Sequence, residues 1–146
     1  PDCPDGSCWR ASLPNVEMTG EFPFEAVPAK LATYDVCLLP LREIDFAYYC
    51  SPIQVFDYLA AGKPVVSSPI GQLEGWRGLV HIASGADAFV QGIETALGQR
   101  TSLHFIERRV FAARNSWDVR VRQVIDALSS IGVSLDDDTA RERVAA

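Results

Sequence analysis

The residues best placed to do chemistry lie at the start of one short amphipathic segment, SPIQVFDYLAAG (51–62). Ser51 is a favoured N-cap residue, and Pro52 suits the first helical position, where its missing N–H costs nothing. A helix that begins here leaves the backbone N–H groups of Ile53 and Gln54 free, and the helix dipole favours an anion beside them. The segment therefore predicts a binding site for a phosphate or another anion.

A carboxylate follows on the same segment. Asp57 comes six residues after Ser51, so a rise of 1.5 Å per residue places it about 9 Å farther along the helix axis. From there it can accept hydrogen bonds from hydroxyl groups attached to the bound phosphate. We predict a diphosphate at the helix start and a sugar diol at Asp57, while the spacing alone also fits an ordinary solvated aspartate.

Four apolar stretches around this helix predict the strands of a sheet. The stretch at 35–41 is continuously apolar rather than alternating, which is typical of a parallel strand covered by helices on both faces. The predicted strands are VEMT (16–19), DVCLLPL (35–41), PVVSS (64–68) and LVHIA (79–83). A polar and aromatic stretch at 42–50 is predicted to be a loop.

Helical spacing of apolar residues predicts the remaining elements. In the central helix, Ile53, Phe56 and Ala60, with Leu59 beside them, are predicted to pack on the sheet, and Gly62 ends the helix. The other helical segments are 23–34, with a separate turn before Pro28, then 86–98, a segment carrying Phe105, Val110 and Ala113, and a last helix from Ser116 to Gly132.

This alternation predicts an α/β fold with a Rossmann-like, mostly parallel sheet flanked by helices over residues 1–132, followed by a charged tail at 133–146. In an open parallel sheet, ligands bind beyond the carboxyl ends of the strands. The central helix begins at that edge, after the strand at 35–41. The predicted anion site therefore faces the expected binding crevice.

The composition excludes several classes of protein. The chain has 146 residues, of which 48% are hydrophobic and 22% charged, and its net charge is −6. No run of lysine or arginine could neutralise a phosphate backbone, so nucleic acid is not an expected partner. No apolar run approaches the ~20 residues that span a bilayer, and the N-terminus lacks a signal-peptide pattern. We expect a cytoplasmic protein without a membrane span.

The cysteines and histidines do not predict a metal site. Cys37 lies inside an apolar run, which favours a buried thiol. Cys3 and Cys8 are close in sequence, but with His81 and His104 they do not form a four-ligand zinc pattern.

One string carries a family resemblance. SPIQVFDYLAAGKPVVSSP, preceded by YDVCLLP, resembles the pattern SP-x-K-x-x-E-Y-x-A-x-G-K-P-V-V in the C-terminal half of GT-B glycosyltransferases, especially the bacterial family 4 (group 1) sugar transferases. The later NSWDVRVRQVIDAL is similar to the final tryptophan-bearing helix of that family. The resemblance covers residues 13 to 130.

The resemblance implies that residues 1–132 form a partial donor-binding domain for a nucleotide-diphosphate sugar. Ser51, Pro52 and Ile53 would lie at the diphosphate, and Asp57 would take the ribose-binding role that relatives give to glutamate. The implied reaction transfers the sugar to an acceptor, such as a lipid-linked or polysaccharide intermediate, with retention of configuration. The resemblance implies no metal and no cofactor other than the donor substrate.

The sequence departs from the family pattern at two positions beside this site. Tyr49 stands where many relatives have a second acidic residue near the donor sugar, and Gln54 replaces the usual lysine. Arg42, in the preceding loop, is a candidate for the missing positive charge, although it also fits an ordinary surface arginine. No catalytic base can be named from these residues.

The resemblance also implies parts that this sequence lacks. The family's C-terminal domain begins with further strand and helix units, and a complete enzyme has an N-terminal acceptor domain. We therefore expect this chain to be inactive alone, and to cover exposed strand edges by rearrangement, swapping or formation of a homo-oligomer. In the full-length protein we expect a cytoplasmic location, including attachment to the membrane surface.

Two other functions fit parts of the pattern. A noncatalytic α/β interaction domain is compatible with Tyr49 and Gln54. A receiver-like signalling module is suggested by an aspartate near a strand and by Lys63-Pro64, but Asp35 begins its strand instead of ending it. Dinucleotide binding is disfavoured because no G-x-G-x-x-G follows a strand.

Overall fold

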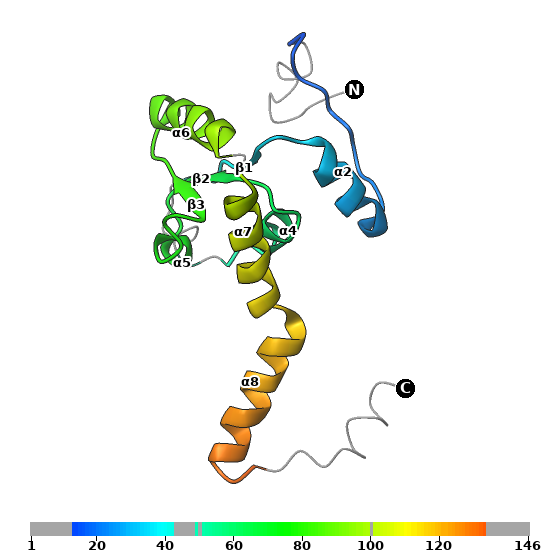
Figure 1. Cartoon of the computed structure of the whole chain (residues 1–146), viewed down its shortest axis with the longest axis vertical. Helices are drawn as coiled ribbons and strands as arrows, with labels where there is room; N and C mark the ends of the chain where they lie inside the picture. Colours follow the sequence, from blue (N-terminus) through cyan, green and yellow to red (C-terminus); the bar gives the residue numbers. More distant parts are fainter. Residues whose placement is uncertain (1–12, 43–48, 50, 100, 134–146) are drawn as a thin grey trace.

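The structure, a computed structural model, describes residues 13–42, 49, 51–99 and 101–133. Within them, a small parallel sheet lies between two layers of helices (Figure 1). The predicted loop at 42–50 and the tail at 133–146 lie almost entirely outside the described residues. The elements in chain order are η1 (Phe24–Ala26), α2 (Val27–Thr33), β1 (Cys37–Leu39), α4 (Gln54–Ala60), β2 (Val65–Ser67), α5 (Gly71–Glu74), β3 (Val80–Ile82), α6 (Ala86–Gly98), α7 (Ser102–Arg114) and α8 (Trp117–Ser130).

The sheet in the described part of the chain has three parallel strands in the order β1-β2-β3. Val65 of β2 is paired with Cys37 on one side and with Val80 on the other. Helix α4 connects β1 to β2, and α5 connects β2 to β3, as parallel pairing requires. The expected α/β fold with a mostly parallel sheet is confirmed.

The strand predicted at 16–19 is wrong. Residues 16–20 have no regular secondary structure, and Val16 and Met18 are exposed. A short β-prone run becomes a strand only where it can pair with a sheet edge and bury one face. Figure 1 shows this segment, in blue, running away from the sheet, so it neither pairs with a strand nor buries a face against the sheet.

Both faces of the sheet are covered, and each has its own core. Val65 belongs to the core that the sheet forms with α4, α5 and α7, where Leu59 and Leu73 are fully buried. Val66 faces the opposite way and packs with Ala96 of α6. Adjacent residues of one strand thus serve opposite layers, which explains why the strands are apolar without alternation.

The face of α4 that packs on the sheet differs from the predicted one. Val55 and Leu59 are fully buried, whereas Ile53 is 62% exposed and Ala60 is exposed. Positions four apart lie on one face of a helix, so Val55 and Leu59 form the true core stripe. Ile53, Phe56 and Ala60 instead line a hollow that α4 shares with the end of α7 and the start of α8.

Two helix ends follow the predicted punctuation. The turn Phe24–Ala26 precedes α2, and Pro28 occupies the first turn of that helix, as expected. Lys63 donates from Nζ to the carbonyl oxygens of Ala32 (2.9 Å) and Tyr34 (2.8 Å), which holds the end of α2 against the loop before β2.

Helix α8 begins after Ser116, whose hydroxyl accepts a hydrogen bond from the Val119 N–H, and it ends before Gly132, as predicted. Its apolar residues Val121, Val124 and Ile125 are exposed, because the helix extends away from the sheet (Figure 1). Among the described helices, α8 included, none combines the length and apolar character needed to cross a membrane.

Cys37 is 5% exposed, which confirms the buried thiol. Burial raises its pKa from the ordinary value of 9.0 to about 11, with the charge of Lys63 opposing the shift. The unfolded thiol therefore ionises first, and we expect stability to fall as the pH rises from about 9 toward about 11. Urea unfolding at about pH 8 and about pH 10.5 should show a smaller alkaline loss for Cys37→Ala than for the unmodified protein. An equal loss in both would contradict this assignment.

Candidate functional site

A groove of about 610 Å³ lies between α4 and the end of α7. We call it the α4–α7 groove. From the α4 side it is lined by Ser51, Ile53, Phe56, Asp57 and Ala60, with Phe24 at one edge. From the other side it is lined by Arg109, Ala112, Ala113, Asn115, Ser116, Trp117 and Arg120.

The two helices run antiparallel along this groove. Arg108, in the first half of α7, contacts Gly62 beyond the end of α4. Ala113, near the end of α7, lines the groove together with Ile53 at the start of α4. The start of α4, the end of α7 and the start of α8 therefore meet at one place.

The groove brings together three of the seven predicted site residues, namely Ser51, Ile53 and Asp57. The other four are not among the residues that line it. Pro52 is half-buried, Gln54 and Arg42 are exposed, and Tyr49 is 83% exposed.

The start of α4 differs from the prediction. The helix begins at Gln54 with Ile53 in a helical conformation at the cap, and no side chain caps it. The Val55 N–H donates to Pro52 O (3.3 Å) and the Phe56 N–H to Ile53 O (3.0 Å), so a tight turn replaces the expected Ser51 cap. No described residue accepts from the N–H groups of Ile53 or Gln54.

Asp57 is half-buried and ends the first turn of α4. It lines the α4–α7 groove and also an adjoining, mostly apolar cleft of about 420 Å³ between α4 and α2. Burial raises the pKa of its carboxyl group. Partial burial removes some of the water that would solvate the carboxylate, so hydrogen-bond donors that a ligand brings would stabilise its charged form.

Arg120 is the main groove residue that sequence reasoning missed. Its guanidinium carbon lies 5.2 Å from the ring centroid of Phe56, a residue in the first turn of α4. Its Nε donates to Asn115 O (3.3 Å), and Nη2 lies 3.5 Å from Asn115 Oδ1. The sequence does place Arg120 in NSWDVR, one helical turn after the Ser116 cap. The spacing of residues cannot show which other element the first turn of α8 contacts.

The junction between α7 and α8 sets the direction of Arg120. Asn115 donates from Nδ2 to Phe111 O (2.9 Å), which fixes its side chain at the end of α7. Ser116 then caps α8. Phe111 and Phe56 both pack on Trp76, with ring centroids 4.9 and 5.2 Å apart, so a row of aromatic rings supports this end of the groove.

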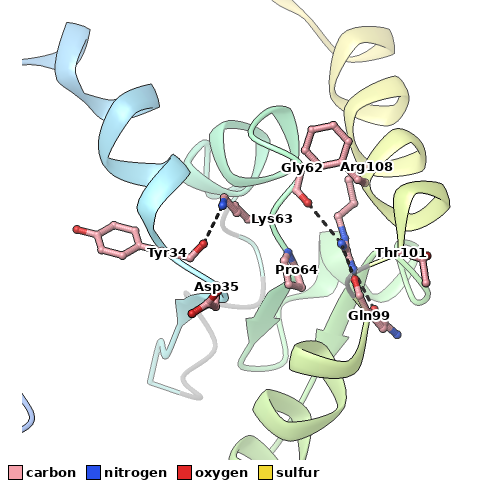
Figure 2. A pocket seen from close by; sticks show the side chains of 9 residues that line it. Tyr34, Asp35, Gly62, Lys63, Pro64, Gln99, Thr101 and Arg108 are labelled. Atoms are coloured by element: carbon pink, nitrogen blue, oxygen red, sulfur yellow. Dashed lines mark hydrogen bonds between the residues drawn. The ribbon is translucent and has the colours of Figure 1, made fainter.

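A third pocket, of about 160 Å³, lies at the amino ends of β1 and β2. Figure 2 shows Tyr34 and Asp35 before β1, Lys63 and Pro64 before β2, and Arg108 donating to Gly62 and Gln99. Its two cations already donate to protein carbonyl oxygens. Because ligands of parallel sheets bind at the carboxyl edge, we assign this pocket to structure. Asp35 lies at the amino end of β1, which does not match a receiver.

Within the described residues, no group of three or more histidine, cysteine or acidic side chains is arranged to hold a metal ion. The polar side chains of the groove are instead one carboxylate, the two hydroxyls of Ser51 and Ser116, the Asn115 amide and two guanidinium groups, those of Arg109 and Arg120. Such a set can bind a ligand that carries both hydroxyl groups and negative charge.

Comparisons with known proteins give one family model and one relative that this chain resembles. The family model described as "Glycosyl transferases group 1" matches residues 5–99. A Bacillus subtilis (strain 168) protein named "Putative teichuronic acid biosynthesis glycosyltransferase TuaH" is 28% identical over 118 residues, which cover 77% of this chain and 30% of that protein. This chain therefore spans about 30% of the relative's length. No solved structure matches the chain significantly.

The matched range contains β1, α4, β2 and β3, the sheet and the helix that carry the motif. The match covers well over half of the sequence, and the matched residues form the parallel sheet and α4. This chain therefore belongs to the group 1 glycosyltransferases.

Proposed function

We propose that this chain is the donor-binding part of a glycosyltransferase that uses a nucleotide-diphosphate sugar. The observation that carries the proposal is the α4–α7 groove, because it combines Asp57 and Ser51 of the family motif with the guanidinium of Arg120. The diphosphate lies at the start of α4 and the ribose diol at Asp57. No metal and no further cofactor are needed in this arrangement.

The proposed contribution to catalysis is stabilisation of the leaving diphosphate. As the bond to the sugar breaks, negative charge grows on the diphosphate oxygens, and fixed donors at that position lower the barrier. The N–H groups of Ile53 and Gln54 have no acceptor among the described residues, as is usual for the first N–H groups of a helix. Transfer proceeds with retention of configuration in this proposal.

The proposal extends to the rest of the enzyme. The acceptor is a polysaccharide or lipid-linked intermediate, in line with the name of the Bacillus relative. An N-terminal acceptor domain supplies the other wall of the cleft. The Bacillus relative is long enough to contain such a domain, because the matched segment covers only 30% of it. The enzyme acts in the cytoplasm, at the membrane surface when the acceptor is lipid-linked.

The main test removes the carboxylate of Asp57. Titration calorimetry of purified full-length protein with a panel of nucleotide-diphosphate sugars should show saturable binding. Asp57→Ala should weaken that binding about tenfold to a hundredfold, because a hydrogen-bonded charged group is lost. Asp126→Ala, on the exposed part of α8, is a matched control and should leave the affinity unchanged.

Asp57→Asn separates binding from folding. The raised pKa of Asp57 means that its ionised form is disfavoured in the folded state, so its contribution to stability is present below the unfolded pKa and is lost as the pH rises. At neutral pH the asparagine variant should therefore unfold at an equal or higher urea concentration while binding the donor more weakly. Lower stability together with unchanged affinity would contradict the proposal.

The alternatives give different results in the same experiments. A noncatalytic interaction domain would bind no nucleotide sugar, and Asp57→Ala would change nothing. A receiver-like module would form an acyl phosphate with a small phosphodonor, which the proposed donor site would not.

A further inference from the structure

We propose that Arg120 contacts the diphosphate of the donor and supplies the positive charge that the motif lacks in this chain. The inference rests on the proposed function, because it assigns a residue to the same site. It replaces the expectation that Arg42 has this role. Arg42 and Gln54 are both exposed, and neither lines the α4–α7 groove.

The position of Arg120 along α4 makes Arg120, and not Arg109, the candidate for contact with the diphosphate. The groove has two guanidinium groups, and they stand at opposite ends of α4. Arg109 lies 5.5 Å from the ring centroid of Phe105, and that ring packs against Gly62 beyond the end of the helix. Arg120 lies over Phe56, within the first turn, beside the proposed diphosphate position.

Arg120 is held in place before any ligand binds. Its guanidinium rests on the Phe56 ring, and its Nε and Nη2 are directed at Asn115. Asn115 is fixed in turn by its own hydrogen bond to Phe111 O. A guanidinium with its torsions restricted loses less conformational entropy on binding an anion, which strengthens the interaction.

Its donors are only partly used. A guanidinium has five N–H groups, and two of those of Arg120 are directed at Asn115 within the described residues. The others have no acceptor there and lie at a groove wall that also contains the Ser116 and Asn115 side chains. Arginine with free, coplanar donors binds phosphate oxygens in a bidentate manner.

The test compares ligands with and without phosphate. Calorimetry of full-length protein with uridine, adenosine, guanosine and thymidine diphosphates identifies the bound base, and the matching nucleoside is the phosphate-free probe. Arg120→Gln keeps the stem over Phe56 and removes the charge. It should weaken diphosphate binding about tenfold to a hundredfold and change nucleoside binding less than twofold.

Three further variants make the result specific. Arg122→Ala removes the same charge from an exposed position on α8, and Arg114→Ala removes it from the exposed end of α7, at a residue that does not line the groove. Both should change diphosphate affinity less than threefold. Arg120→Lys keeps the charge without the bidentate fork, so its affinity should lie between those of Arg120→Gln and the unmodified protein.

The outcomes separate this inference from the function on which it rests. If Arg120→Gln binds diphosphate normally while Asp57→Ala does not, Arg120 is not the diphosphate cation and the proposed function stands. If Arg120→Gln loses nucleoside and diphosphate binding equally, its role is structural and the inference is overturned. If the unmodified protein binds no nucleoside diphosphate, the proposed function fails and this assignment fails with it.

Discussion

Arg108→Ala is expected to lower the free energy of unfolding by about 3 kcal/mol, which corresponds to a fall of about 10 °C in Tm for a domain of this size. Arg108 is only 2% exposed. Its Nη2 donates to Gln99 Oε1 (2.9 Å), and Nη1 lies 3.4 Å from both Gly62 O and Gln99 O. The alanine variant leaves these acceptors in a partly buried cavity without their donor.

The loss spreads because Gln99 links further elements. Its Oε1 also lies 3.1 Å from His81 Nε2, and since an amide oxygen can only accept, His81 carries a proton on Nε2. Arg108 thus joins α7 to the end of α4, to the end of α6 and, through Gln99, to β3. Burial lowers the pKa of Arg108, opposed by Glu107. The charge itself is therefore a cost that its acceptors offset.

The measurement is hydrogen–deuterium exchange of α6 and α7 peptides in the full-length protein, together with urea unfolding. Arg109→Ala is the matched control, since this neighbour is exposed and its loss should change stability by about 0.5 kcal/mol or less. Faster exchange in α7 should accompany weaker donor binding, because α7 forms one wall of the groove. Unchanged exchange in Arg108→Ala would show that these hydrogen bonds do not hold the helix.

The fold was predictable because its signals are local. The apolar runs that became β1, β2 and β3, the Gly62 and Gly132 stops and the Ser116 cap all depend on a few adjacent residues. The structure shortens the strands to their paired residues but keeps their order. The strand predicted at 16–19 is wrong because strand formation there depends on a pairing partner that the sequence does not specify.

The face of α4 shows where sequence patterns are ambiguous. The helix has seven residues, and two stripes on it are apolar. Val55 and Leu59 form one, and Ile53, Phe56 and Ala60 form the other. Either could have packed on the sheet, and only the position of α7 decides that the second stripe becomes a groove wall.

The cations of the structure depend on contacts between distant parts of the sequence. Arg108 contacts Gly62 across 46 residues, and Arg120 reaches Phe56 through the α7–α8 junction. Neither arginine lies in the family motif. From the sequence pattern of its helix alone, each would be predicted to be an ordinary charged residue in contact with solvent. The motif could therefore locate the start of the site and Asp57, but not the opposite wall.

Gly62→Ala is the second change with a large expected effect, about 2–4 kcal/mol of destabilisation. Gly62 has φ = +71°, which alanine adopts at a cost of about 1–2 kcal/mol. It ends α4 with two hydrogen bonds, from its own N–H to Leu59 O and from the Lys63 N–H to Tyr58 O, both 2.9 Å. An added Cβ would also lie 2.2 Å from Cδ2 of Phe105, too close for any real contact.

The two parts of this cost can be separated by a double-mutant cycle. Phe105 is 43% exposed, so its ring can move aside at the expense of the packing between α4 and α7. Gly62→Ala should therefore destabilise the protein less in a Phe105→Ala background, and the remainder measures the backbone conformation alone. Because α4 and α7 form the groove, single Gly62→Ala should also weaken donor binding, and the second substitution should not restore it. Equal destabilisation in both backgrounds would mean that the ring does not constrain Gly62, and the close packing of α4 on α7 would then have to be held by Arg108 instead.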